Sequence, residues 1–209
     1  MYFIHIFKPE TMMTNLKETL MLDKIIANKS KIHTRDIKLA TYSHTDSRVI
    51  IHGVLKDERY IKIFDITGKV LEPGIVHHLD VKLLIKPEPL IIEDAQVQMI
   101  KVPMSECSAT LDTIEKLKGL EIKSGFSKTI RDIMGGKKGC AHLCQLIIVM
   151  SQEIVQGWLT HKRKNSSPVP KDLDSFAEKK FIIDSCRMWT SNGPKIKTLE
   201  QAIKAQQEL

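Results

Sequence analysis

Aromatic residues are scarce in this chain, and long apolar runs are absent. Phe, Trp and Tyr together make up 5% of the 209 residues, so no stacking platform for single-stranded nucleic acid is evident. No run approaches the roughly 18 apolar residues of a membrane span. The apolar residues 1–7 lack the basic segment and cleavage site of a secretory signal. We therefore expect a cytoplasmic protein that does not enter the membrane.

Familiar catalytic signatures are missing as well. The chain has no Ser-His-Asp signature, dinucleotide fingerprint, kinase motif, P-loop or His-Glu-x-x-His zinc motif. At 42% apolar residues it can bury a core without disulfides, and we expect its four cysteines to be reduced thiols. Whether the protein is an enzyme is left open by the sequence.

The charge balance is moderately basic, with a formal net charge of +7. Such a surplus would suit nucleic acid or an acidic membrane surface. The lysines are scattered, however, usually near Asp or Glu, and the one dense run is residues 161–164. We therefore expect neither partner, while a small anionic ligand remains a candidate. The oligomeric state is not indicated.

A period of two dominates the first half of the chain after a short amphipathic helix expected over residues 14–27. In one such stretch, Val49, Ile51 and Gly53 share a face. The connections are short, which favours antiparallel neighbours. The pattern predicts five strands, over residues 32–42, 48–56, 59–66, 75–86 and 90–101.

Helical spacing follows. We expect helices over residues 106–118, capped by Ser105, and 125–134, capped by Ser124, and a long one from near Gly139 to Leu159. Residues 174–188 also look helical, Asn192-Gly193-Pro194 reads as a stop, and residues 198–209 as a loosely held helix. This order predicts an α+β fold, an antiparallel sheet of about five strands followed by helices on one face. Around this core, residues 1–30 are expected to form an extension with a short helix, and residues 195–209 a polar tail.

The most reactive segment is Gly-Gly-Lys-Lys-Gly-Cys-Ala-His at residues 135–142. A helix start offers unpaired N–H groups and partial positive charge, which favour an anion near Gly136, Lys137 and Gly139 and a thiolate at Cys140. On a regular helix Cys140 and His142 would point about 200° apart. They can converge only if Cys140 precedes the first turn. The alternative is two helix caps back to back, with Cys140 as a small buried residue.

Other cysteines and histidines carry weaker signals. Cys144 would share a helix face with Cys140, and packing is its default role. His77 and His78 are adjacent in a predicted strand, so one faces inward and the other faces solvent. A lone histidine is more often structural than a ligand.

The ordered set of these residues resembles the bacterial family called domain of unknown function 2889, over about residues 31–194. The residues that carry the resemblance are His33-Thr34-Arg35, Tyr42, Asp46, Gly53, Leu55, Asp57, His77, Cys107, Gly119-Leu120, Ile122, Gly125-Phe126, Gly135-Gly136, Gly139-Cys140, His142-Leu143 and Asp184-Ser185-Cys186 with Trp189. The resemblance implies a cytoplasmic single-domain protein without an established activity. Two residues depart from the family pattern. The family usually has an acidic residue at the position of Cys144 and often an arginine at the position of His44.

The resemblance also implies which residues belong to one candidate site. It moves the partners of Cys140 toward His77, Cys107 and Cys186, and the candidate site becomes Cys140, His142, His77, Cys107, His33, Arg35 and Cys186. We predict a site for a transition metal such as zinc or iron, with Cys140, His77 and Cys107 as ligands, or for an anionic small molecule. The alternative is a non-catalytic binding or accessory module with no chemistry at the cysteines.

Overall fold

The computed structural model describes residues 21–45, 47–165, 168–176 and 178–208. The chain divides into two compact units. The first comprises residues 1–34 and 58–74, described from residue 21 onward, and the second comprises residues 35–57 and 75–209. Among the described residues, no helix is both long and apolar enough to cross a membrane.

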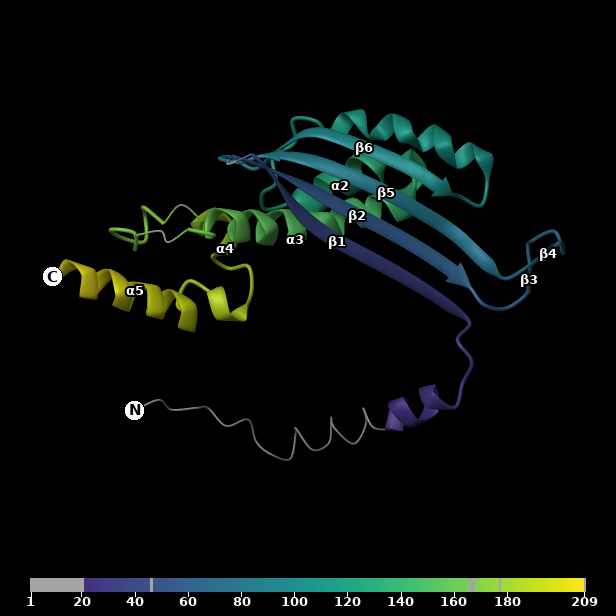
Figure 1. The fold of residues 1–209 in the computed structure, drawn as a ribbon, viewed down its shortest axis with the longest axis horizontal. Coiled ribbons are helices and arrows are strands. Elements are labelled where there is room, and N and C mark those ends of the chain that lie inside the picture. Colours follow the sequence, from purple (N-terminus) through teal and green to yellow (C-terminus); the bar gives the residue numbers. More distant parts are fainter. Residues whose placement is uncertain (1–20, 46, 166–167, 177, 209) are drawn as a thin grey trace. The chain divides into compact units, whose positions relative to one another are not determined.

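The main sheet is antiparallel and has the strand order β1-β2-β5-β6 (Figure 1). Its strands are β1 (His33–Thr45), β2 (Arg48–Arg59), β5 (Gly74–Lys86) and β6 (Ile91–Lys101). The strand expected over residues 59–66 is reduced to β3 (Ile63–Phe64), which pairs with β4 (Val70–Leu71) in a separate two-stranded sheet. The predicted α+β class with an antiparallel sheet is confirmed.

Strict alternation along the central strands creates one buried face. Val49, Ile51 and Leu55 of β2 are fully buried, as are four residues of β5: Leu79, Val81, Leu83 and Ile85. Burial of each such side chain contributes roughly 1.5–3 kcal/mol to folding. The helices α2 (Phe126–Met134) and α3 (Ala141–Lys162) supply the apolar side chains of the same core. The sheet is therefore covered by helices on this face, as expected.

Two glycines lie where the long helix α3 packs against the sheet. A Cβ on Gly53 would lie 2.6 Å from the Met150 sulfur, and one on Gly157 would lie 1.9 Å from Thr41 Oγ1. Thr41 in turn donates a hydrogen bond to Glu153 at 2.6 Å. A Cβ at position 157 would therefore clash with Thr41 of β1, whereas one at position 53 would require the flexible Met150 side chain to move.

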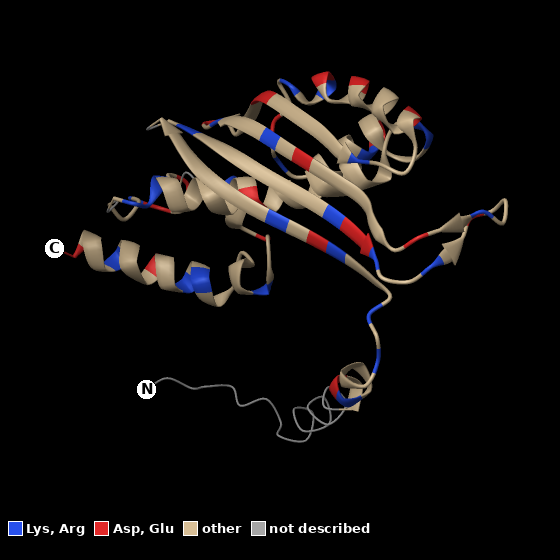
Figure 2. Cartoon of the chain, turned by 45° about the vertical axis from the view of Figure 1, so that its right-hand side comes forward, with Lys and Arg blue, Asp and Glu red and all other residues tan. Residues whose placement is uncertain are grey.

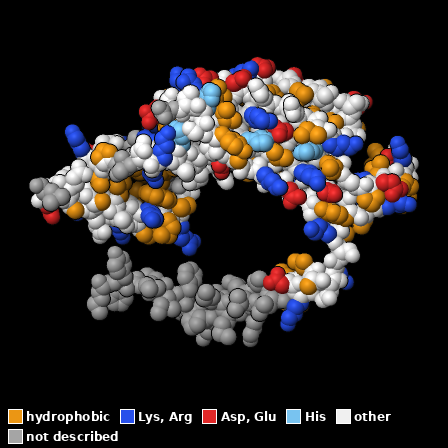
Figure 3. Space-filling view, in the orientation of Figure 1, with side chains coloured by type: hydrophobic (Ala, Val, Ile, Leu, Met, Phe, Trp, Pro, Cys, Tyr) orange, Lys and Arg blue, Asp and Glu red, His pale blue; other side chains and the backbone are white. Residues whose placement is uncertain are grey.

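The opposite face of the sheet is polar and partly exposed. His52 Nε2 lies 2.8 Å from Asp80 Oδ2, and Lys82 contacts the other oxygen of the same carboxylate. Counting residues of both faces, Lys and Arg alternate with Asp and Glu along the strands (Figure 2). In the space-filling view, hydrophobic, basic and histidine side chains lie next to one another on the surface over the sheet (Figure 3).

The segment after the sheet is less regular than expected. Residues 106–118 form 3-10 turns, η1 (Ser105–Thr113) and η2 (Glu115–Leu117), in place of the predicted α-helix, and Ser105 caps neither. α2 begins after Gly125, whose φ of 85° suits glycine, and Ser124 does not cap it. α3 runs three residues beyond the expected Leu159. The helix starts set by glycine were predictable, while the serine caps were wrong.

The C-terminal region also differs from expectation. The helix predicted over residues 174–188 shrinks to α4 (Lys179–Ile182) and the 3-10 turn η4 (Arg187–Trp189). Pro194 does not stop a helix but begins one, α5 (Pro194–Gln207), in the first-turn position where its missing N–H costs nothing. Ile196 and Ile203 of α5 are buried, so this part of the predicted tail is a packed helix.

The first unit contains a helical turn and a hairpin. Residues 21–27 are helical, whereas residues 14–20 of the expected N-terminal helix lie outside the described residues. In the hairpin, the Asp65 carboxylate accepts hydrogen bonds from the backbone N–H groups of Thr67 and Lys69, at 2.8 and 3.0 Å. Gly68 supplies the positive φ that the turn requires.

Candidate functional site

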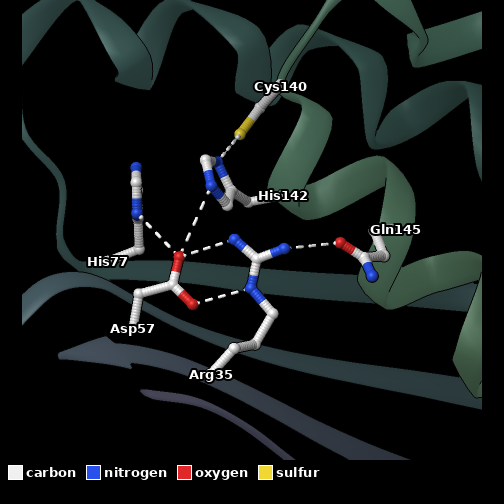
Figure 4. Close-up of polar contacts among 6 residues, drawn as sticks. All are labelled: Arg35, Asp57, His77, Cys140, His142 and Gln145. Carbon is white, nitrogen blue, oxygen red and sulfur yellow. Dashed lines mark hydrogen bonds and ion pairs between the residues drawn. The ribbon is translucent and has the colours of Figure 1, made fainter. Parts of the chain in front are cut away.

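Three neighbouring strands bring polar side chains to the helix-covered face of the second unit. Arg35 comes from β1, Asp57 from β2 and His77 from β5, while His142 and Gln145 come from the first turns of α3 (Figure 4). Asp57 continues the buried alternation of β2, two residues after Leu55. Residues 142 and 145 are three apart and so share a helix side.

The Asp57 carboxylate is the hub of this cluster. Its side chain is 2% exposed. Arg35 donates to it through two nitrogens, Nε to Oδ1 at 2.7 Å and Nη2 to Oδ2 at 2.8 Å. Oδ2 also lies 3.0 Å from His77 Nδ1 and 3.4 Å from His142 Nε2. Arg35 is itself held by Gln145, whose Oε1 accepts from Nη1 at 2.8 Å.

Electrostatics fixes the charge of the hub. Burial pushes the pKa of Asp57 upward, but the hydrogen bonds and positive charge of Arg35, with smaller contributions from His142 and His77, bring that pKa below its usual value. The carboxyl is therefore ionised at neutral pH. The paired, bidentate geometry is the strong form of the arginine–carboxylate interaction.

The two histidines stack above the carboxylate. Their ring centroids are 3.6 Å apart and the ring planes differ by 28°. Burial lowers the pKa of His142, and the charges of His77 and Arg35 lower it further, against the opposing effect of Asp57. His142 is consequently neutral at pH 7 and keeps a lone pair for a proton or a metal ion.

Asp57, His77 and His142 bring ligand atoms close enough together that one metal ion could contact all three. Each offers one ligand atom, and these three atoms lie within 4.8 Å of one another. Ligands at 2.0–2.1 Å from a tetrahedral zinc ion sit about 3.3 Å apart, close to the 3.0 and 3.4 Å separations around Asp57 Oδ2. Arg35 contacts both carboxylate oxygens, Oδ1 through Nε and the ligand oxygen Oδ2 through Nη2, and so orients the carboxylate as groups around metal ligands commonly do.

Cys140 stands beside this group. It has an extended backbone (φ −90°, ψ 123°) and precedes α3, which begins at Ala141. Its sulfur lies 3.9 Å from His142 Nδ1. The condition that allows the two side chains to converge is therefore met. The Cys140 thiol and His142 Nδ1 can share a hydrogen bond, whose direction is set by the tautomer of His142.

The glycines before Cys140 have a packing role. A Cβ on Gly135 would lie 2.5 Å from the Arg131 carbonyl oxygen, and one on Gly139 would lie 2.9 Å from that of Met134. Lys138 donates to the Asp132 carbonyl at 2.6 Å. The turn between α2 and α3 thus needs small residues for close approach. An anion at Gly136, Lys137 and Gly139 stays a prediction.

The remaining predicted residues are more dispersed. His33 is exposed at the start of β1, Cys107 is half-buried in η1, and Cys186 is exposed beside η4. Cys144 is buried, and burial raises the pKa of its thiol. Of the expected ligands Cys140, His77 and Cys107, only His77 belongs to the metal-capable group found among the described residues.

Sequence reasoning placed Arg35, His77, Cys140 and His142 in the candidate site but left out Gln145 and Asp57, although Asp57 is among the residues that carry the family resemblance. A signal for Asp57 was present, because the alternation of Val49, Ile51 and Gly53 continues through Leu55 to residue 57. An ionisable residue at the end of a buried stripe needs a partner. Gln145 gave no comparable signal.

The fold and the cluster define a mixed α/β protein with an Asp-His-His group between an antiparallel sheet and a helix. Residues 33–156 match the family described as protein of unknown function, DUF2889. This match covers more than half of the chain, which belongs to that family, as the resemblance predicted. Searches of curated proteins and of solved structures gave no match. The matched region contains the whole cluster and ends before Cys186.

Proposed function

We propose that this protein binds a divalent transition metal, zinc or iron, through Asp57, His77 and His142. The observation that carries the proposal is the convergence of one carboxylate oxygen and two imidazole nitrogens within 4.8 Å on the buried side of the sheet. Carboxylate and imidazole together suit zinc and iron.

The protonation states support metal binding. A metal ion needs an ionised carboxylate and a neutral imidazole, and the pKa of Asp57 and that of His142 are both shifted downward, toward these forms. Arg35 opposes a cation by its charge but keeps Asp57 ionised and oriented. Three protein ligands would leave a coordination position for water or a substrate, the arrangement of catalytic zinc sites.

The test is metal titration of protein purified without a histidine tag and stripped with a chelator. Calorimetry with Zn²⁺ and with Fe²⁺ under anaerobic conditions should give one ion per chain. His142→Ala should weaken binding by more than about tenfold, since loss of even an outer partner typically costs 10–100-fold. Elemental analysis of the untreated protein identifies the native metal.

The chain offers a matched control on the other face of the sheet. His52 and Asp80 form a histidine–carboxylate pair at 2.8 Å with a lysine alongside, yet they do not belong to the metal-capable group of the described residues. His52→Ala should leave the affinity unchanged. The proposal would be contradicted if folded His142→Ala bound the metal as tightly as wild type does. It would also be contradicted if His52→Ala lost as much metal affinity as His142→Ala.

A further inference from the structure

A second candidate site lies away from the Asp57 cluster. A cavity of about 740 Å³ is bounded by residues 122–127, which lead into α2, by one side of α3 from Ser151 to Leu159 with Arg163 after it, and by residues 180–186 and Trp189. It shares no residue with the cluster, whose helical members lie in the first turns of α3. Its volume is in the range that holds small organic molecules.

The charges at the cavity are mostly positive. Its lining contains three cationic side chains, Lys123, Arg163 and Lys180, and one carboxylate, that of Asp184. Asp184 is occupied by the adjacent turn, where it accepts hydrogen bonds from the backbone N–H of Ser191 at 3.0 Å and from its hydroxyl at 3.0 and 3.2 Å. Lys123 pairs with Glu121 at 2.8 Å.

Arg163 and Lys180 are different from Lys123. Neither forms an ion pair with another residue in the part of the chain that the structure describes. The lining thus carries three cationic side chains and one carboxylate, which leaves a net positive charge that an anion would offset. The cavity is therefore complementary to negative charge.

The start of helix α2 and two hydroxyl groups add to this complementarity. The nine-residue helix α2 starts at the cavity with Gly125 as its N-cap, and no side chain caps it. The N–H groups of Phe126 and Lys128 already donate to the carbonyls of Lys123 and Gly125, at 3.0 and 2.9 Å, so α2 contributes chiefly the positive end of its dipole to this region. The hydroxyls of Ser124 and Ser127 line the cavity as well.

The other walls are apolar. Phe126, Leu159, Phe181 and Trp189 contribute to the lining, and Leu159, Phe181 and Trp189 also belong to the small second core around α4. An inorganic ion would leave this apolar surface in contact with water. A ligand with a negatively charged end and an apolar body would satisfy both parts.

We propose that this cavity binds a small organic anion, a carboxylate or phosphate ester carrying an apolar or aromatic body. The cationic side chains and the α2 start hold the charged group, and the aromatic wall packs against the body. The site does not depend on the metal proposed above.

The test uses the full-length protein in the presence of a chelator and 8-anilinonaphthalene-1-sulfonate as the probe. Fluorescence titration should show saturable binding of one probe per chain. Benzoate and phenyl phosphate should displace it, and their relative strength distinguishes a carboxylate from a phosphate preference. Benzyl alcohol, a neutral analogue, should not.

Variants locate the charged contacts. Arg163→Gln and Lys180→Gln should each weaken binding about fivefold, or about 1 kcal/mol, the upper end of what an exposed ion pair contributes, because both side chains are exposed. Lys195→Gln removes one charge from an exposed residue of α5 outside the cavity and serves as the matched control, with no change expected. Thermal melting verifies that all three are folded.

Alkylation provides an independent location. Cys186 is exposed and lines the cavity, whereas Cys107 does not. Saturating phenyl phosphate or benzoate should slow the reaction of Cys186 with N-ethylmaleimide at least threefold and leave Cys107 unaffected. The proposal is overturned if neither anion protects Cys186, if benzyl alcohol competes equally, or if the two cavity variants bind as wild type does.

Discussion

Replacement of Arg35 by methionine should destabilise the protein through the carboxylate it leaves behind. Asp57 is 2% exposed and would lose two charge-assisted hydrogen bonds of 2.7 and 2.8 Å. Breaking a buried ion pair from one side typically costs about 3–5 kcal/mol. Arg35 is 34% exposed, so water screens part of the interaction, and we expect a loss of about 2–3 kcal/mol in the free energy of unfolding.

Urea denaturation of the metal-free protein at pH 7 measures this loss. Arg48→Met is the matched control, because Arg48 makes the same two-bond contact with Glu93, at 2.7 and 3.0 Å, on exposed surface. Arg48→Met should lower the free energy of unfolding far less than Arg35→Met does. Adding Asp57→Asn to Arg35→Met should recover stability, since the unpaired charge is then gone. Equal losses for Arg35→Met and Arg48→Met, or no recovery in the double variant, would refute the reasoning.

Three further predictions concern protonation, thiol reactivity and packing. Because the pKa of His142 is lower in the folded state, the unfolded chain binds more protons below about pH 6.5. The free energy of unfolding should therefore fall from pH 7.5 to 5.5, less steeply in His142→Gln, as measured by urea denaturation; an identical slope would contradict this. Alkylation mapped by mass spectrometry should modify the exposed Cys186 first and Cys144, buried with a raised pKa, last. Gly157→Ala should lower stability by about 1–3 kcal/mol through its clash with Thr41, and an unchanged melting temperature would show that α3 can shift.

The sheet was predictable because its periodicity is strong. The alternation of β2 and β5 is unbroken, and short connections fix antiparallel neighbours. Residues 59–66 misled because their apolar side chains are largely exposed in the hairpin unit, where Phe64 and Ile66 face solvent. Local pattern shows which residues alternate but not whether a partner strand lies alongside.

The helical half was predictable where glycines or a long apolar stripe marked it. α3 follows its stripe, and Cys140 adopts the extended conformation needed to meet His142. Residues 106–118 and 174–188 have helical spacing too, but spacing alone does not stabilise a helix. The first segment forms 3-10 turns, and the second contains only the four-residue helix α4 and the turn η4. The metal-capable group depended on Asp57, whose importance comes from contacts with residues as distant as 142.

The span of the polar cluster has a consequence for biosynthesis. The contact between Arg35 and Gln145 joins residues 110 positions apart. Pairing of β1, β2 and β5 can precede it, but Asp57 acquires its full set of partners only after α3 has been made and has docked. A growing chain would carry Asp57 and Arg35 on a helix-free sheet surface, open to water, and the docking of α3 would close that surface and complete the cluster in the same step.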